Sequence, residues 1–235
     1  MAHQLRKYDL LALPVLDTDG LLVGIVTFDD AMDVMVEEAT EDITKMAAVS
    51  PSEKTYFEVS AWEHAKRRIP WLLVLMFSSI ITGTIITRYE DAFAAIPLLV
   101  SFIPMLMDTG GNCGSQSSTL IIRGIALNQV TFHDFFRVIW KEFRVSLIVG
   151  VVLAVANGLR IYLTYQQAGM AVVIALSLVA TVISAKLLGC ILPMCAKKIG
   201  LDPALMASPL ITTIVDASSI MTVSYTHLRA HETDQ

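Results

Sequence analysis

The sequence predicts a mainly α-helical, polytopic membrane protein with five transmembrane helices, preceded by a partial α/β motif. Of its 235 residues, 54% are hydrophobic and 17% are charged, and the mean hydropathy is +0.62. This composition is typical of membrane proteins and not of soluble domains. A first apolar segment has no charge and is long enough to cross about 30 Å of hydrocarbon. The five predicted spans are residues 69–87, 92–122, 145–165, 171–196 and 204–223.

Charge is distributed unevenly along the chain. Residues 1–64 contain thirteen acidic and four basic side chains, whereas the remaining 171 residues contain nine acidic and thirteen basic ones. An acidic head before a mildly basic, hydrophobic body argues against nucleic acid as a partner and is compatible with cation binding.

Basic residues also predict the orientation, because they alternate across the predicted spans. One side has Arg88 and Arg160, and the other has Lys66, Arg67, Arg68, Arg123, Arg137, Lys141, Arg144, Lys197 and Lys198. The positive-inside rule therefore predicts a cytoplasmic N-terminal part and a cytoplasmic 123–144 loop. Aromatic residues in that loop indicate a helix lying along the membrane interface.

The N-terminal part has the signals of a hairpin followed by a helix. Apolar runs at 10–16 and 21–28 flank an Asp-Thr-Asp-Gly turn, and acidic residues then open a helix. This order resembles the second half of a CBS motif, which we assign to residues 1–42. CBS pairs often bind adenine nucleotides, and Thr27 and Asp30 match the GxxTxxD pattern of that pocket. ATP is therefore a candidate ligand of the complete CBS module.

Residues 43–68 are polar and predict a connecting, plug-like amphipathic helix region. Pro51 divides it, and a second helix is expected over 52–68 with Ser50 or Ser52 as its cap. Lys66, Arg67 and Arg68 then bring the connector to the bilayer.

Asp216 lies within the last predicted span, where a carboxylate costs about 2.5–3.5 kcal/mol and normally faces protein or water. Helical spacing places Ser208, Thr212 and Ser219 on its stripe, which predicts a pore-lining face. A buried aspartate hydrogen-bonded to a neighbouring helix is the alternative. The opposite face is expected to meet lipid through Ile211, Ile214 and Val215.

The stretch MDTGGNCGSQSSTLIIRG at 107–124 is the second polar feature inside a predicted span. Gly110 and Gly114 form a GxxxG pair, which alone predicts only close helix packing. Asn112, Gln116 and Thr119 form a second polar stripe, and the glycines leave backbone carbonyls uncovered. Asp108 either caps a restarted helix or stands at a pore mouth.

Together the two stripes offer a carboxylate, amides, hydroxyls and carbonyls. An all-oxygen lining suits a hard cation such as Mg²⁺ or Ca²⁺, whereas zinc, copper or iron would favour His or Cys ligands. No histidine lies in a predicted span. An enzyme is not expected, because no nucleophile–base or metal-hydrolase pattern is present.

Residues 107–124 resemble the second transmembrane helix of MgtE-type magnesium channels, with the pattern TGGNxGxQSxTLxxR. GLDPALMASPLITTIVDASS at 200–219 resembles the fifth helix of that family, and 37–47 with 62–73 resemble its CBS-to-membrane junction. The resemblance implies a homodimer in the bacterial inner (plasma) membrane, with a Mg²⁺ pore between protomers. It implies Asp216 as the pore ion site, with pore-lining residues Gly110, Gly111, Asn112, Gly114 and Thr212. Mn²⁺, Co²⁺ and Ni²⁺ are alternative ions.

The resemblance also implies a cytosolic Mg²⁺ sensor that closes the pore through the connecting helix. Its candidate residues are Asp29, Asp33, Glu37, Glu38, Glu41 and Asp42. A merely solvated acidic face is the alternative for these side chains. The alternative function is an ion-coupled divalent cation carrier or exchanger for Mg²⁺, Co²⁺ or Mn²⁺ on the same scaffold.

The sequence departs from the family pattern at both ends. It lacks the N-terminal helical domain and the first one and a half CBS motifs. Residues 224–235 form a polar tail where the family continues an apolar helix. We expect this tail to come from a truncated or misjoined reading frame.

Overall fold

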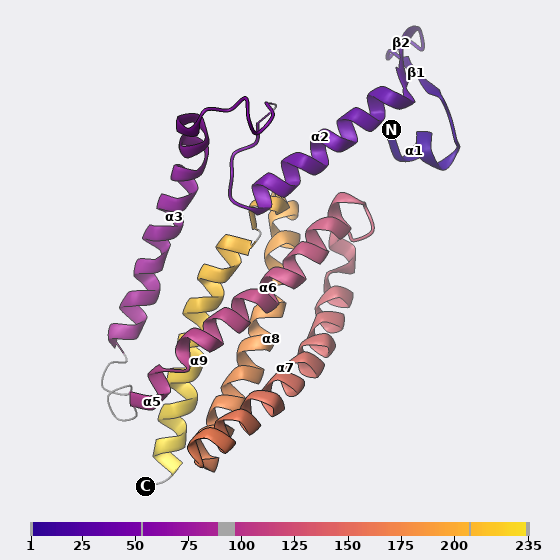
Figure 1. Cartoon of the computed structure of the whole chain (residues 1–235). Helices are drawn as coiled ribbons and strands as arrows, with labels where there is room; N and C mark the ends of the chain where they lie inside the picture. Colours follow the sequence, from indigo (N-terminus) through magenta and orange to yellow (C-terminus); the bar gives the residue numbers. More distant parts are fainter. Residues whose placement is uncertain (1, 53, 89–96, 207, 234–235) are drawn as a thin grey trace.

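A computed structural model describes residues 2–52, 54–88, 97–206 and 208–233, with side chains only to residue 222 in the last helix. Long helices form a bundle, and a small N-terminal part extends from one end of it (Figure 1). The elements are α1 (Ala2–Lys7), β1 (Ala12–Leu16), β2 (Leu22–Thr27), α2 (Phe28–Met46), α3 (Ala61–Arg88), α5 (Pro97–Val100), α6 (Ile103–Ala126), η1 (Phe132–Asp134), α7 (Phe135–Tyr165), α8 (Ala168–Lys198), η2 (Pro203–Met206) and α9 (Ser208–Thr233).

The predicted hairpin and the helix after it are confirmed. Strands β1 and β2 pair antiparallel, with Ala12 opposite Thr27. The turn is stabilised by Asp17, whose Oδ1 accepts the backbone N–H groups of Asp19 at 2.9 Å and Leu21 at 2.8 Å. Gly20 adopts a φ of +79°, a conformation that glycine reaches without steric cost. Assignment of this hairpin to a CBS motif stays a prediction.

The connector differs from its predicted form. Its helix begins at Ala61 and not at residue 52, and Ser50 and Ser52 do not cap it. Ser60 does so instead, because its Oγ accepts the backbone N–H of Glu63 at 3.2 Å. Helix α3 then continues without interruption to Arg88, so the end of the connector and the first predicted span form one helix.

Four helical segments of the described chain are long and apolar enough to cross a membrane. They are Ala61–Arg88, Phe132–Tyr165, Ala168–Lys198 and Pro203–Thr222. The predicted second span begins at 92–96, outside the described residues, and its described part forms α5 and α6. Helix α6 is not among the four, because polar side chains interrupt its apolar sequence. A fifth crossing therefore stays a prediction.

Successive long helices run in opposite directions, and the start of α3, the end of α6, the start of α7 and the end of α8 all lie near α2 (Figure 1). These are the ends that carry the nine basic residues of the predicted cytoplasmic side. The prediction of a separate interfacial helix in the 123–144 loop, however, is wrong. The aromatic residues Phe136 and Trp140 belong to the first turns of α7 and are exposed there.

Glycines allow α6 to approach α8 and α9 closely. A Cβ atom built at Gly110 would lie 2.7 Å from Val215 Cγ1, and one at Gly114 would lie 2.7 Å from Ile211 Cγ2. Ile211 and Val215 are consequently 0% exposed, so the prediction that they meet lipid is wrong. The α6 glycines provide the space that these branched side chains fill.

We expect Gly189→Ala to destabilise the bundle by about 1–3 kcal/mol, the usual cost of overpacking a filled core. The added methyl group would overlap the backbone carbonyl oxygen of Gly114, which cannot move aside as a flexible side chain can. Thermal unfolding of the detergent-solubilised protein measures the effect. Gly158→Ala is the control, because its Cβ would meet Ala175 Cβ at an ordinary 3.6 Å. Equal midpoints for the two variants would contradict the expectation.

Candidate functional site

The seam between α6 and α9 brings several predicted pore residues together. Thr212 stands against Gly111, since a Cβ built there would lie 2.9 Å from Thr212 Cγ2. Asp216 follows one helical turn later and is partly buried. The charge of Asp108, from α6, is close enough to interact with the Asp216 carboxylate. Thr212 and Asp216 of α9 therefore lie along the seam with α6.

Polar side chains of α6 face outward from the bundle. Asn112, Gln116 and Thr119 are exposed and, with Ser115 and Leu120, line a shallow surface hollow. The helix is continuous from Ile103 to Ala126, so Asp108 is an interior residue of α6. The capping alternative for Asp108 is wrong.

Gly110, Gly111 and Gly114 are buried against α8 and α9. Their carbonyl groups belong to an unbroken helix, in which each accepts an intrahelical hydrogen bond. Close packing is thus the observed role of the glycine pair, and lining of an ion path by these residues stays a prediction.

The residues of the predicted α9 stripe do not share one environment in the structure. Ser219 is 1% exposed and its hydroxyl donates to the carbonyl oxygen of Val215 at 2.7 Å, so it belongs to the packed face. Thr212 and Asp216 remain partly accessible. The side chain of Ser208 lies outside the described residues.

A buried polar cluster joins α6, α7 and α8. Ser117 Oγ donates to Glu142 Oε2 at 2.7 Å, and Lys186 Nζ donates to Ser117 Oγ at 3.2 Å. Lys186 Nζ lies 3.9 Å from Glu142 Oε2, and these two charged residues are 5% and 9% exposed. Sequence reasoning missed Glu142. The signal was available, because the small residues Ser146, Gly150 and Ala154 continue its helical face at four-residue spacing and are buried.

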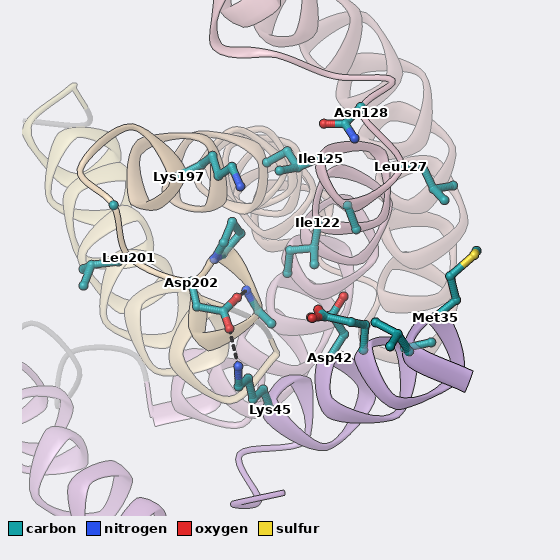
Figure 2. A pocket seen from close by; sticks show the side chains of 17 residues that line it. Met35, Asp42, Lys45, Ile122, Ile125, Leu127, Asn128, Lys197, Leu201 and Asp202 are labelled. Atoms are coloured by element: carbon teal, nitrogen blue, oxygen red, sulfur yellow. Dashed lines mark hydrogen bonds and ion pairs between the residues drawn. The ribbon is translucent and has the colours of Figure 1, made fainter. Parts of the chain in front are cut away.

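On the α2 side, a cavity of about 760 Å³ separates α2 from the connection between α8 and η2. Glu38 and Asp42 are the sensor candidates that line it, and Asp202, which sequence reasoning did not single out, lines the facing wall (Figure 2). Glu41 does not line the cavity, but it forms an ion pair with Lys45, which does. The exposed Asp29, Asp33 and Glu37 do not line the cavity.

Lys45 is the electrostatic centre of this cavity. Its Nζ lies 2.6 Å from Asp202 Oδ2 and 2.5 Å from Glu41 Oε1, and hydrogen bonds to these two carboxylates raise the pKa of Lys45. Burial opposes ionisation of Asp202, but hydrogen bonds from Lys45 and from the Ala204 N–H outweigh it and lower the pKa of Asp202.

The pKa of Asp42 shifts in the opposite direction to that of Asp202. Burial, and next the charge of Asp202, raise the pKa of Asp42 above its ordinary value. A cation entering the cavity would favour the charged form of this carboxyl. Among the described residues, no three His, Cys, Asp or Glu side chains converge closely enough to hold a metal ion by themselves.

The candidate nucleotide residues pair with each other at the start of α2. Thr27 Oγ1 donates to Asp30 Oδ2 at 2.5 Å, and the side chain of Asp30 is exposed. The Thr27 hydroxyl is also the main reason why the pKa of Asp29 is lowered. Binding of ATP at this turn stays a prediction.

Known proteins resemble most of the chain. Residues 103–226 match the MgtE family model, described as a divalent cation transporter. The chain is 38% identical over 221 residues to the magnesium transporters MgtE of Bacillus subtilis and Thermus thermophilus, covering 94% of this chain and 49% of each relative. The Enterococcus faecalis magnesium transporter MgtE is 33% identical, with 94% and 48% covered. The chain therefore spans about half the length of these relatives.

We expect Asp202→Asn to weaken docking of α2 in a pH-dependent way. Because the folded state lowers the pKa of Asp202, the charged carboxylate stabilises the fold above about pH 4, its unfolded-state pKa, and this contribution is lost as the pH falls through the lower folded value. The pair is partly exposed, so the loss at neutral pH should be about 0.2–1 kcal/mol. Unfolding of the wild type and the variant, followed between about pH 7 and pH 3, measures it.

Asp33→Asn, at an exposed position of α2, is the control for this series. A deficit of Asp202→Asn that stays constant down to the acid end would mean that the carboxylate charge is not its cause.

Proposed function

The chain belongs to the MgtE family of divalent cation transporters, and we propose that it mediates transport of Mg²⁺ across a membrane. The observation that carries the proposal is the position of Asp216, which stays partly accessible on α9 one turn after Thr212, the residue that packs against Gly111 of α6. The negative charges of Asp216 and Asp108 repel each other, and a divalent cation near both would relieve that repulsion. Magnesium retains several waters when bound, so a few oxygen ligands suffice to guide it.

We propose that Asn112, Gln116 and Thr212 complete the path as polar contacts to the hydrated ion. The exposed polar face of α6 cannot be left in lipid without cost, because buried polar groups require partners. A second copy of the chain that placed the same face opposite would enclose the stripe in water, which favours a homodimer with its pore between protomers.

In this arrangement α6 also crosses the membrane, which brings the number of crossings to five. Its 24 residues span about 36 Å at 1.5 Å per residue. The end of the bundle with nine basic residues would face the cytoplasm of a bacterium, which places α2 on the cytoplasmic side of the inner membrane.

We further propose that the cavity between α2 and η2 senses cytosolic Mg²⁺. Glu38, Asp42 and Asp202 supply three carboxylates on its two walls. Occupation by Mg²⁺ would draw α2 toward the connection that leads into α9 and Asp216. The cation concentration on one side of the membrane would thereby bias the pore helix.

We expect Asp216→Asn to reduce Mg²⁺ flux about tenfold or more, because a loss of only 1.4 kcal/mol in ion binding changes an equilibrium tenfold. Asp108→Asn, at the neighbouring carboxylate, should reduce it less. Flux is measured with a Mg²⁺ indicator in proteoliposomes containing the full-length protein. Glu58→Gln, which removes a carboxylate from the exposed connector, is the matched control and should transport normally.

Normal transport by Asp216→Asn would remove this residue from the ion path. The same preparation separates the channel from the alternative of an ion-coupled carrier. Flux that requires an imposed Na⁺ or H⁺ gradient would identify a carrier.

For the sensor, the measured quantity is the Mg²⁺ concentration on the cytosolic side at which the flux falls to half. We expect Asp42→Asn to raise this concentration about fivefold or more, as is typical of coupling between two sites. The reason is the loss of one of three carboxylates on the cavity walls. Asp33→Asn removes the same charge from the exposed surface of α2 and should leave inhibition unchanged. Identical inhibition curves for Asp42→Asn and the wild type would refute a sensor at this cavity.

A further inference from the structure

We propose that Glu142, Ser117 and Lys186 form a buried positioning site that sets the rotation of α6 about its own axis. It thereby fixes the direction in which the exposed stripe of α6 faces. The inference rests on the proposed transport function, because it assigns to this cluster the orientation of a stripe that would contact the ion.

The first step concerns the bonds themselves. Ser117 Oγ both donates to Glu142 Oε2 at 2.7 Å and accepts from Lys186 Nζ at 3.2 Å. One α6 hydroxyl is therefore held by an anion from α7 and a cation from α8. Hydrogen bonds to charged groups are stronger and more directional than contacts between apolar side chains.

The second step concerns burial. Ser117 is 0% exposed, and the charged residues of the cluster are nearly as buried. A lone charge at such a site would be costly, so each member depends on the other two. Rotation of α6 would separate Ser117 from both partners and leave an incompletely bonded ion pair in the protein interior.

The third step concerns the faces of α6. At 3.6 residues per turn, Asn112 and Thr119 lie roughly 140–160° around the axis from Ser117. Gln116 lies about 100° from Ser117. Gly114 lies nearly on the Ser117 side and packs against α8 and α9. The glycine face permits close approach but offers no directional bond, so packing alone tolerates small rotations. The cluster removes that freedom and holds the stripe away from the buried side.

Three variants of the full-length protein in proteoliposomes test the proposal: Glu142→Gln, Lys186→Met and the two combined. Each single variant should lower the thermal midpoint, because it leaves a buried group unpaired. The double variant should recover the midpoint, because no lone charge remains. Its Mg²⁺ concentration for half-maximal flux should nevertheless differ from wild type by about fivefold or more, since α6 is no longer held.

Val182→Ala is the control for stability alone. Val182 is 0% exposed on α8, one turn before Lys186, and truncating it creates a cavity without touching a charge. It should lower the midpoint and leave half-saturation unchanged. A double variant with both the midpoint and the half-saturation of the wild type would overturn the proposal. If the double variant does not fold, Ser117→Ala replaces it: an unchanged half-saturation there overturns the proposal in the same way.

A readout independent of transport separates failure of this inference from failure of the proposed function. Gln116→Cys reports the accessibility of the stripe to a water-soluble thiol reagent. Its labelling rate should change severalfold when Glu142→Gln and Lys186→Met are added, and an identical rate would contradict the positioning role. Absence of Mg²⁺ flux in the wild type would refute the transport proposal and leave this labelling comparison valid.

Discussion

The close approach of α6 to α8 and α9 is the constraint on which the rest of the bundle depends. Helix α6 has too many polar side chains to be surrounded by lipid, so its buried face must be satisfied by protein. Gly110, Gly114 and Gly189 make this possible, because without side chains they admit Val215, Ile211 and a neighbouring backbone. Docking of that face leaves Asn112 and Gln116 on the exposed side of α6, and we propose that the buried cluster fixes their exact direction.

The same helices connect the polar N-terminal part to the seam. Lys45 pairs with Asp202, and Asp202 in turn accepts the N–H of Ala204 at the start of η2. Met46 packs against Ile122 of α6 and Ala204. A displacement of α2 would therefore act directly on the end of α6 and on η2, which precedes α9. Thermodynamic coupling requires only that a ligand favour one docking geometry of α2 over another.

Local signals in the sequence predicted much of the local structure, and long-range contacts account for the wrong face of α9 and the missed Glu142. The Asp17 turn, the opening of α2 and the apolar lengths of α3, α7, α8 and α9 are read from consecutive residues. Helical periodicity showed that α9 has two faces but could not tell which one meets lipid, because that depends on the glycines of another helix. Glu142 was missed for a similar reason: its partners are 25 and 44 positions away in the chain.

Two carboxylates of the helical bundle illustrate how partners determine what an acidic residue can do. Glu142 has Lys186 and Ser117 as resident partners, so its charge is already neutralised and a visiting cation would have to displace an ammonium. Asp216 has another carboxylate, Asp108, as its electrostatic neighbour, and no Lys or Arg of the described residues pairs with it. Its charge is therefore not compensated by any Lys or Arg in the part of the chain that the structure describes. In the proposed function, a site of this kind would attract a mobile divalent cation, whereas the paired site would hold helices in place. The different roles proposed for Glu142 and Asp216 thus follow from the sign of the nearest charge.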